Sequence, residues 1–289
     1  MSESIGPNAL IVEGGAMRGV FSCGVLDQFL AESFSPFDSF WGVSAGASNL
    51  AAYLARMPGR NLKVYTDYSC RRAFLTPGRF LLGRDLMDLD WMWRVTLEEL
   101  GLDKEALRAE SRPFFLGVTR RDSGEAEYHT PDPDDLADTM KASSALPLLY
   151  RNGVPLNGQR YVDGGVADAL PVAEAIRRGA RRVMVLRSRP ASYRKAPTRA
   201  PRLLSRLLRD TPALIPPMLS RAERYNAALD LIRQPPKGVQ ILEVCPPEHF
   251  RLKRLTRDPA PLHQGYQLGQ EAAQDAIQRW QESEVVITP

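Results

Sequence analysis

The sequence has few of the residues that bind metals or form disulfides, with three cysteines and three histidines among 289 residues. Cys23, Cys70 and Cys245 are widely spaced, and no two of them form a CxxC pair. Because structural zinc sites and disulfide frameworks need clustered ligands or paired thiols, we expect no metal and no disulfide. Unpaired thiols are typical of a reducing compartment, so we expect a cytoplasmic protein.

The sequence also lacks a membrane-spanning run, a leader and a strong excess of one charge. The charge-free stretch 39–55 is interrupted by glycine, serine and asparagine and is shorter than the roughly 20 apolar residues that a spanning helix needs. The N-terminus shows neither the basic nor the apolar region of a secretory signal. The net charge is only +4, so we expect no nucleic-acid partner.

Apolar runs and helical patterns alternate along the chain. A strand-like run at 8–13 precedes a helical pattern at 19–30, and a second run at 37–43 precedes another at 45–56. Further strands are expected at 113–119, 126–130, 182–186 and 239–244, and helices at 134–144, 171–178, 220–233 and 264–281. This repeated unit predicts a layered α/β fold around a parallel sheet. Since no repeat or low-complexity tract divides the chain, we expect one domain over 1–289.

Residues 42–46 (GVSAG) fit the pattern G-x-S-x-G between an expected strand and an expected helix. In a nucleophile elbow, small residues flank the serine because the sharp strand-to-helix turn brings neighbouring backbone close. The turn exposes the hydroxyl and places the start of a helix behind developing negative charge. The pattern predicts Ser44 as a nucleophile, with Gly42 and Gly46 shaping the elbow.

A glycine-rich loop, GGAMRG at 14–19, ends the first expected strand. Paired glycines let a backbone present free N–H groups to an anion, as an oxyanion hole requires. A dinucleotide-binding loop needs the spacing G-x-G-x-x-G and an acidic residue at the end of the next strand, and this sequence has neither. Taken alone, the loop is either an anion-binding loop or a plain tight turn.

Asp163 is followed by Gly164 and Gly165 after a short apolar lead. A carboxylate at the end of a strand, followed by glycines, can approach another loop and hold a hydrogen bond to a serine hydroxyl. The other interpretation is an ordinary Asp-Gly turn. Asp168 is a competitor for the same role, but no glycine pair follows it.

Together, these three segments resemble the patatin-like phospholipase family. The loop at 14–19 resembles its oxyanion loop, GVSAG its serine elbow, and DGG at 163–165 its aspartate motif. The segments 142–147 (ASSALP) and 163–172 (DGGVADALPV) also match the family in order and spacing, so that the resemblance covers about residues 8–190.

The resemblance implies a three-layer α/β/α fold with a central, mostly parallel sheet, in which 8–190 form the catalytic core and 191–289 an extension packed on it. It implies a serine acyl hydrolase for lipid esters, of the phospholipase A or esterase type, that needs no cofactor. Ser44 would carry the acyl group and Asp163 would be the general base. The implied oxyanion loop comprises Gly14, Gly15, Ala16, Arg18 and Gly19.

Two alternatives stay open at this point. A Ser–His–Asp hydrolase would use His249 or His263 after an acid such as Asp163 or Asp210. A non-catalytic, lipid-binding relative would keep the fold without the chemistry.

Two further segments allow more than one interpretation, and for the basic segment nucleic acid is a third one, disfavoured because Tyr193 is its single aromatic residue. Residues 177–209 contain twelve Lys or Arg and no Asp or Glu. With Arg202, Arg206 and Arg209 on one helical face, the run is either a contact for anionic lipid at the inner face of the membrane or a solvated basic face whose leucines pack on the core. The expected helical insertion at 57–112, with Trp91, Met92, Trp93 and the apolar 80–82, is either an acyl-binding wall or ordinary core. If the first interpretation of the basic run holds, the contact with the lipid surface is expected over 177–209.

Overall fold

The computed structural model describes residues 5–71 and 88–285. Its centre is a sheet of eight strands, hydrogen-bonded in the order β5-β6-β3-β2-β1-β7-β8, with β4 also paired to β3. The strands are β1 (Asn8–Val12), β2 (Ser39–Val43), β3 (Phe114–Arg120), β4 (Ala126–His129), β5 (Val154–Leu156), β6 (Gln159–Asp163), β7 (Arg182–Leu186) and β8 (Gln240–Val244).

The sheet is mostly parallel, as the sequence predicts. β1 pairs in parallel with β2 and β7, and the parallel part extends to β3 on one side and β8 on the other. β4, β5 and β6 add antiparallel pairings at the β3 end. β4 lies where a strand is expected at 126–130, and it returns along β3. Strands covered on both faces need nearly continuous apolar runs, which explains the sequences NALIV in β1 and RVMVL in β7.

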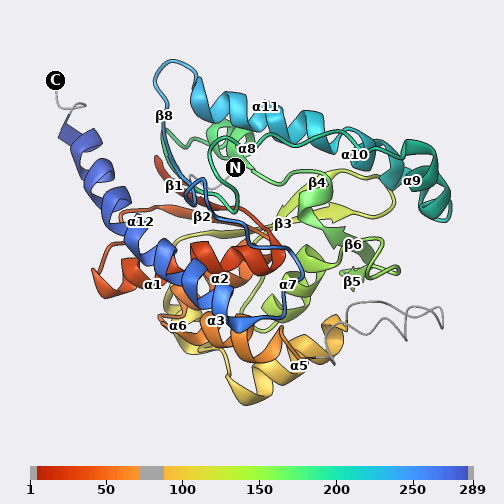
Figure 1. Ribbon diagram of the computed structural model, residues 1–289, viewed down its shortest axis with the longest axis horizontal. Helices are drawn as coiled ribbons and strands as arrows, with labels where there is room; N and C mark the ends of the chain where they lie inside the picture. The colour runs from red at the N-terminus through yellow and green to blue at the C-terminus, as the bar shows by residue number, and fades with distance from the viewer. Residues whose placement is uncertain (1–4, 72–87, 286–289) are drawn as a thin grey trace.

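Helices surround the sheet (Figure 1). They are α1 (Val20–Ala31), α2 (Ala45–Leu54), α3 (Arg60–Lys63), a π-helical turn (Val64–Tyr68), α5 (Leu89–Glu99), α6 (Lys104–Ala109), α7 (Leu136–Ser144), α8 (Val172–Arg177), α9 (Pro201–Leu207), α10 (Ile215–Leu219), α11 (Arg221–Arg233) and α12 (Pro259–Val285). No helix among the described residues is long and apolar enough to cross a membrane.

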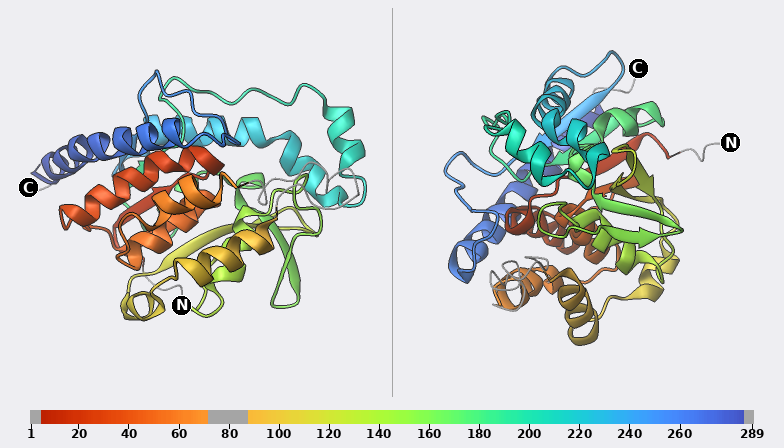
Figure 2. Two further views of the ribbon diagram at one scale, coloured as in Figure 1. Left: turned by 60° about the horizontal axis from the view of Figure 1, so that its bottom comes forward. Right: turned by 90° about the vertical axis from the view of Figure 1, so that its right-hand side faces the viewer.

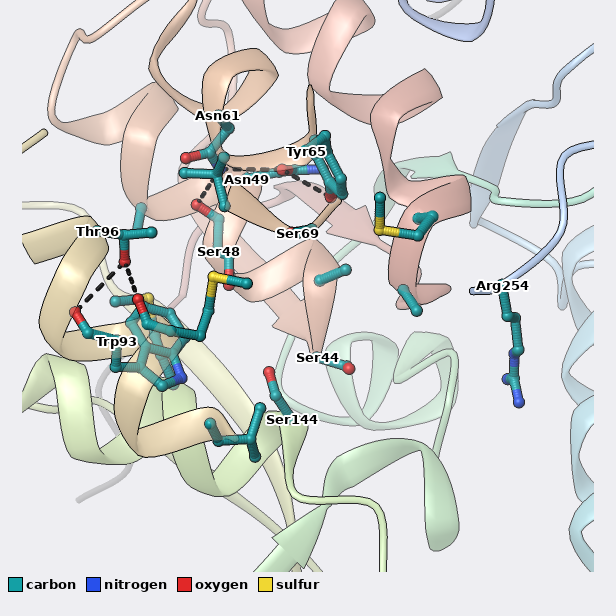
Figure 3. A pocket seen from close by; sticks show the side chains of 18 of the residues that line it. Ser44, Ser48, Asn49, Asn61, Tyr65, Ser69, Trp93, Thr96, Ser144 and Arg254 are labelled. Atoms are coloured by element: carbon teal, nitrogen blue, oxygen red, sulfur yellow. Dashed lines mark hydrogen bonds between the residues drawn. The ribbon is translucent and has the colours of Figure 1, made fainter. Parts of the chain in front are cut away.

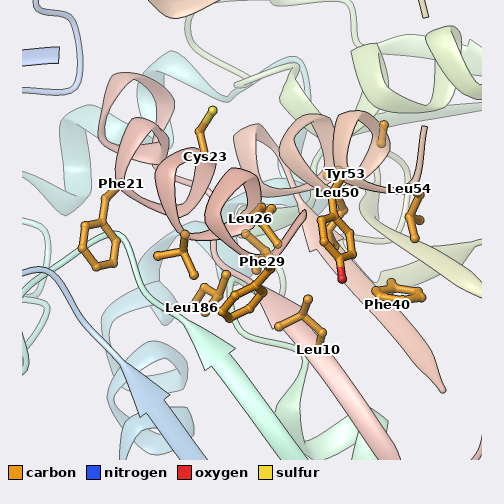
Figure 4. Close-up of a cluster of buried hydrophobic side chains, with 14 of the residues drawn as sticks. Leu10, Phe21, Cys23, Leu26, Phe29, Phe40, Leu50, Tyr53, Leu54 and Leu186 are labelled. Atoms are coloured by element: carbon orange, nitrogen blue, oxygen red, sulfur yellow. The ribbon is translucent and has the colours of Figure 1, made fainter. Parts of the chain in front are cut away.

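Alternate residues of β1 build two separate cores, because successive side chains of a strand point to opposite faces. Leu10 and Val12 pack with α1, α2 and α12 in the larger core, part of which is drawn in Figure 4. Ala9 and Ile11 pack with α8 and α11 on the other face. The sheet is therefore the middle of three layers, which confirms the predicted α/β/α architecture.

The C-terminal part of the chain shares these cores. β8 extends the sheet beside β7, and α11 contributes Leu229 and Ile232 to the second core. α12 lies along α1, as both panels of Figure 2 show, and buries Trp280 against Phe37. The division into a core at 8–190 and an extension at 191–289 stays a prediction.

The segment between α2 and β3 is helical where it is described, as expected for 57–112. α3 and α6 lie beside α2, and α5 lies beside α7. α3, the π-helical turn and α5 form a wall of a cavity that is described below. Asp88 begins α5 by accepting the backbone N–H of Trp91 at 3.0 Å, which is an ordinary N-cap. The apolar run at 80–82 lies outside the described residues.

Candidate active site

Ser44 lies in a sharp turn between β2 and α2. Its backbone has φ 54° and ψ −125°, a conformation that costs a residue other than glycine about 1–3 kcal/mol and that persists only where the surrounding structure enforces it. The turn also needs small neighbours: a Cβ on Gly46 would collide with the carbonyl oxygen of Val12, and one on Gly42 with the backbone of Ala47. This is the geometry that the G-x-S-x-G pattern predicts.

β3 brings Ser44 and Asp163 together. Gly117 of β3 is paired with Val43, the last residue of β2, and also with β4. The next residue, Val118, is paired with Asp163, the last residue of β6, and also with β4. Since a strand residue has one neighbour on each edge, β4 occupies one edge of β3 while β2 and β6 share the other. The two strands therefore meet end to end, and their last residues lie beside consecutive residues of β3.

The main chain around Asp163 is fixed by hydrogen bonds. Its N–H donates to the carbonyl of Ala145 at 2.9 Å, and its carbonyl accepts from the buried hydroxyl of Thr119 at 2.9 Å. Its Oδ1 accepts the N–H of Gly165 at 2.8 Å. Gly164 passes so close to β3 that a Cβ there would collide with the carbonyl of Gly117. The glycine pair thus lets Asp163 approach the elbow, and the hydrogen bonds of the main chain fix the position of the Asp163 carboxyl group.

The carboxyl of Asp163 is buried, with 3% of the residue exposed. Burial raises its pKa above the ordinary 3.8, and this effect exceeds the opposing effects of the Arg221 charge and of the hydrogen bond from the Ser44 hydroxyl. A general base works best when its pKa lies near the working pH, so this direction suits proton abstraction from Ser44.

Part of the glycine-rich loop faces the same place. Gly14, Gly15 and Ala16 line a cavity together with Ser44 and Asp163. Within the described part of the chain, the N–H groups of these three loop residues donate to no protein acceptor. Free backbone donors beside a serine hydroxyl are the arrangement that an oxyanion requires.

Arg18 and Gly19 are not brought to Ser44. The N–H of Arg18 donates to the carbonyl of Gly15 at 3.3 Å, and its side chain is buried in a separate cleft. Burial, followed by the charges of Arg189 and Arg254, lowers the pKa of Arg18 to about 10. The carbonyl of Gly19 accepts hydrogen bonds from the side chains of Ser22 and Asn49, so this residue anchors the loop from behind.

A largely apolar cavity opens beside Ser44 and measures about 990 Å³ with the open solvent at its mouth included (Figure 3). It is called here the acyl cavity, after the acyl-binding wall that is one of the two interpretations of 57–112. Its apolar walls include Met17, Val64, Leu89, Met92, Trp93, Leu102, Met140 and Leu146. Met92 and Trp93 of the insertion therefore form part of the wall, whereas Trp91 does not line the cavity and packs into the hydrophobic cluster that contains Met92.

One wall of the acyl cavity is a polar network that the sequence did not suggest. Asn49 accepts from the Tyr65 hydroxyl at 3.2 Å and from the Asn61 amide at 3.0 Å, and Asn61 also donates to the carbonyl of Ser48 at 2.8 Å (Figure 3). The network connects α2 to the insertion and keeps its polar atoms bonded to one another, so this wall is fixed in place.

Ser143 is a second residue whose role the sequence did not reveal. Its fully buried hydroxyl accepts the backbone N–H of Ser44 at 2.8 Å and donates to the carbonyl of Gly117 at 2.7 Å. It thereby joins α7, the elbow and β3. The segment 142–147 carried the signal, because it matched the family motif, but the motif did not say what its serine contacts.

The three histidines all lie in the described part of the chain, and none lines a cavity that Ser44 shares. His249 and His263 are exposed, and so is Asp210. His129 contacts Glu127 at 3.1 Å. The structure therefore does not assemble the Ser–His–Asp alternative.

The basic run at 177–209 is divided between the interior and the surface. Arg187 is fully buried and contacts Glu13 and Glu243, while Arg182 stacks on Trp280. Around α9, by contrast, the arginines are exposed, and two leucines also face solvent, Leu203 with 56% and Leu207 with 58% of its surface exposed. The other two leucines of this segment are buried.

Two family models match the chain. Residues 10–176 match the model described as patatin-like phospholipase, and residues 211–284 match a domain of unknown function (DUF6363). The first match contains the elbow, the glycine-rich loop and Asp163, whereas β7 and α9 lie between the two.

The chain is similar, to different extents, to two known proteins and one solved structure. The uncharacterized protein YjjU of Escherichia coli K12 is 36% identical over 269 residues, covering 90% of this chain and 74% of YjjU. The mouse 1-acylglycerol-3-phosphate O-acyltransferase Pnpla3 is 28% identical over 143 residues, 47% of this chain but only 33% of Pnpla3. The crystal structure of VipD from Legionella pneumophila superposes with a TM-score of 0.46 at 14% identity, covering 93% of this chain and 66% of VipD.

Proposed function

This chain belongs to the patatin-like phospholipase family, and from that premise we propose that it is a lipid acyl hydrolase whose acyl-enzyme forms on Ser44. Family membership implies the lipid acyl hydrolase activity. The observation that supports the assignment of residues is the meeting of the Ser44 hydroxyl with the buried Asp163 carboxyl beside three free backbone donors.

In the first half-reaction, Ser44 Oγ attacks the ester carbonyl carbon and passes its proton to the Asp163 carboxylate. The N–H groups of Gly14, Gly15 and Ala16 stabilise the resulting oxyanion. As the tetrahedral intermediate collapses, the bond to the alcohol breaks and the alcohol leaves with the proton from Asp163. The acyl chain stays on Ser44.

In the second half-reaction, water attacks the acyl-enzyme and Asp163 takes its proton. Collapse of this intermediate releases the fatty acid, and the proton returns to Ser44 Oγ. No histidine is needed, because Asp163 serves as base and then as acid in each half. The apolar walls of the acyl cavity, Met92 and Trp93 among them, hold the acyl chain.

The direct test compares wild type with Ser44→Ala and Asp163→Asn on esters of graded acyl length. We expect both variants to lose at least about 100-fold in kcat. A fluorophosphonate probe should label the wild type at Ser44. A protein that is not labelled and hydrolyses no ester above these variants would be a non-catalytic, lipid-binding relative.

Met92 provides a test of where the acyl chain lies. The residue is buried on α5 and lines the acyl cavity, so Met92→Trp should fill part of it and shift the preferred ester to a shorter chain. Met218, which is half-buried in another cluster, gives a matched Met218→Trp control. An unchanged chain-length profile in Met92→Trp would place the acyl chain elsewhere.

The acyl-enzyme also permits transfer to an alcohol instead of water, which is the activity in the printed name of Pnpla3. Supplying a lysophospholipid acceptor with an acyl donor separates the two outcomes. Hydrolysis predicts free fatty acid as the acyl product with and without the acceptor.

We also propose that the protein works in the cytoplasm and contacts the inner face of the membrane reversibly through 177–209. The support is the exposed part of this run around α9, where Arg202, Arg206, Leu203 and Leu207 all face solvent. Co-sedimentation with anionic and with neutral vesicles tests the proposal, and Leu203→Ser with Leu207→Ser should weaken binding. Binding that ignores lipid charge and salt would contradict it.

A further inference from the structure

Ser44 opens on a second cavity that is opposite in character to the acyl cavity. It encloses about 450 Å³, counting its mouth, and is lined by Asp163, the glycine-rich loop and three cationic side chains, Lys195, Arg221 and Arg254. The cations come from the loop after β7, the first residue of α11 and the loop before α12. All three lie outside 10–176, the part matched by the patatin model.

The carboxylates that line this cavity do not balance the positive charge of its three cations. Glu13, on its wall, already accepts hydrogen bonds from Arg187 at 3.2 Å and from the Tyr225 hydroxyl at 2.8 Å. Among the described residues that line the cavity, Asp163 is the one carboxylate left to face the three cations. The site therefore carries an excess of positive charge beside the serine.

Two of the three cations have no hydrogen-bond or ion-pair partner among the described residues. Arg221 Nε donates to the carbonyl of Gly165 at 2.6 Å. Within 5–71 and 88–285, neither Lys195 Nζ nor the Arg254 guanidinium has a hydrogen-bond acceptor or an ion pair, and Lys195 Nζ lies 4.7 Å from the centre of the Tyr225 ring. Partly buried cations that repel one another are stabilised by an anion that joins them.

The pKa of Lys195 reports the same imbalance. Burial, followed by the charges of Arg221 and Arg254, lowers this pKa from 10.5 to about 7, although Glu13 opposes the shift. Burial is the larger cause, and the two neighbouring arginines add to it in pushing Lys195 toward its neutral form.

The two cavities meet at Ser44, and Arg254 lies where they join, since it lines both of them. In Figure 3 the Ser44 hydroxyl points toward the side on which Arg254 extends, while Trp93 lies on the other side. An ester carbonyl at Ser44 has its acyl chain on one side and its alcohol on the other. With the acyl chain in the acyl cavity, the alcohol part lies among the cations.

We infer that Lys195, Arg221 and Arg254 form a subsite for a phosphate group carried by the alcohol part of the ester. Two guanidinium forks and one ammonium match the oxygens of a phosphate. The inference rests on the proposed function, since it assigns the alcohol side of the same reaction. It gives the C-terminal region matched at 211–284 a role in substrate choice, through Arg221 and Arg254.

The test uses two esters that differ in the phosphate alone, a short-chain 1-acylglycerol and the same 1-acylglycerol 3-phosphate. The variants are Arg254→Gln and Lys195→Met, which remove side-chain cations that have no hydrogen bond or ion pair within the described residues. The backbone of Lys195 keeps its hydrogen bonds to the Asn226 side chain in any variant. Lys253→Gln is the matched control, because Lys253 is the neighbouring exposed cation and does not line this cavity.

The quantity to compare is the ratio of kcat/KM for the phosphate ester to kcat/KM for the neutral ester. We expect wild type to favour the phosphate ester at least tenfold, and we expect Arg254→Gln and Lys195→Met each to reduce that preference at least fivefold. Lys253→Gln should keep the wild-type ratio. The same ratio in wild type and in both subsite variants would overturn the inference.

A binding measurement that needs no turnover separates the sources of phosphate. Inorganic phosphate should raise the Tm of Ser44→Ala protein and should do so less when Arg254→Gln is added. If phosphate binds there but the two esters react equally well, the subsite holds free phosphate and not a headgroup. If phosphate has no effect and the esters are equal, the subsite is disproved. Loss of neutral-ester hydrolysis in Ser44→Ala would still support the proposed function.

Discussion

The Ser143 hydroxyl accepts the backbone N–H of Ser44 at 2.8 Å, so a side chain of α7 holds the strained turn that carries the nucleophile. The same hydroxyl donates to the carbonyl of Gly117 at 2.7 Å, and Gly117 is where β3 receives the end of β2. The elbow is thus fixed by a residue 99 positions further along the chain.

Ser143→Ala tests this contact. The change leaves the Ser44 N–H and the Gly117 carbonyl without their partner, and we expect the free energy of unfolding to fall by about 1–3 kcal/mol. Because the turn loses its anchor, kcat should fall while KM for a short ester changes little. Steady-state kinetics and chemical denaturation measure both effects.

The control for Ser143→Ala lies in the same helix. Thr139 is buried and its hydroxyl donates to the carbonyl of Asp135 at 3.2 Å, away from the elbow. Thr139→Ala should lower stability to a similar extent with kcat preserved. If the two variants lose activity in parallel, Ser143 acts through stability alone.

Asp163→Asn should separate stability from activity. Since burial raises the pKa of Asp163, the folded protein holds this proton more tightly than the unfolded chain does, and ionisation of Asp163 costs stability at neutral pH. The asparagine variant should therefore unfold at a higher denaturant concentration than wild type at pH 7, while kcat falls about 10²–10⁴-fold.

The pH dependence of that difference supplies the check. The stabilisation by Asp163→Asn should shrink as pH falls through the folded pKa of Asp163, because wild type then becomes neutral at this position too. The acid limb of kcat/KM should lie above pH 3.8, the ordinary pKa of an aspartate. A variant less stable than wild type at pH 7 would show that the charge of Asp163 stabilises the fold.

The sequence predicts the parts of the site that are set by local backbone geometry. Gly42, Gly46 and Gly164 can be identified from the sequence as motif residues, because their neighbours come too close for any residue with a side chain. The strands beside them can be predicted from the sequence, because continuous apolar runs are typical of strands buried on both faces. For that reason the elbow, the loop and the aspartate could be recognised without coordinates.

The rest depends on where distant segments meet. Lys195, Arg221 and Arg254 sit in no common motif. They converge because α11 packs on one face of the sheet and because the carbonyl of Arg254 accepts the N–H of Met17 in the glycine-rich loop at 3.3 Å. Within the basic run at 177–209, composition alone does not distinguish the buried Arg187 from the exposed arginines of α9. What separates them is the pair of acidic partners at the ends of β1 and β8.

Arg187 should be a determinant of stability. It is fully buried, contacts Glu13 and Glu243, and donates to the Tyr225 hydroxyl at 2.9 Å. Arg187→Met leaves the buried Glu13 without its cation, whereas Glu243 keeps Arg233 at 3.4 Å. We therefore expect a loss of about 3–5 kcal/mol in the free energy of unfolding. Urea denaturation measures the change.

Arg177 is the matched control for Arg187. Its side chain is 69% exposed and pairs with Glu174 on the surface of α8, so Arg177→Met should cost less than about 1 kcal/mol. Adding Glu13→Gln to Arg187→Met should recover part of the loss, because it removes one buried charge. No recovery would indicate that Arg187 contributes by packing, not by charge.

Lys195 should make recognition of a phosphate ester depend on pH. Its pKa of about 7 results from burial and from the cations Arg221, Arg254 and Arg18, against the opposing charge of Glu13. Lys195 is therefore mostly charged near pH 6 and mostly neutral near pH 8.

A lysophospholipid whose phosphate is a diester keeps one negative charge over this range, so its KM should rise up to about tenfold between about pH 6 and pH 8. A bound phosphate raises the pKa of Lys195. In the enzyme–substrate complex Lys195 therefore loses its proton above pH 7, and the change in kcat that this loss causes occurs above pH 7 too. The rise in KM should be absent for a neutral 1-acylglycerol and in Lys195→Met, and a variant that keeps the full rise would assign it to another group.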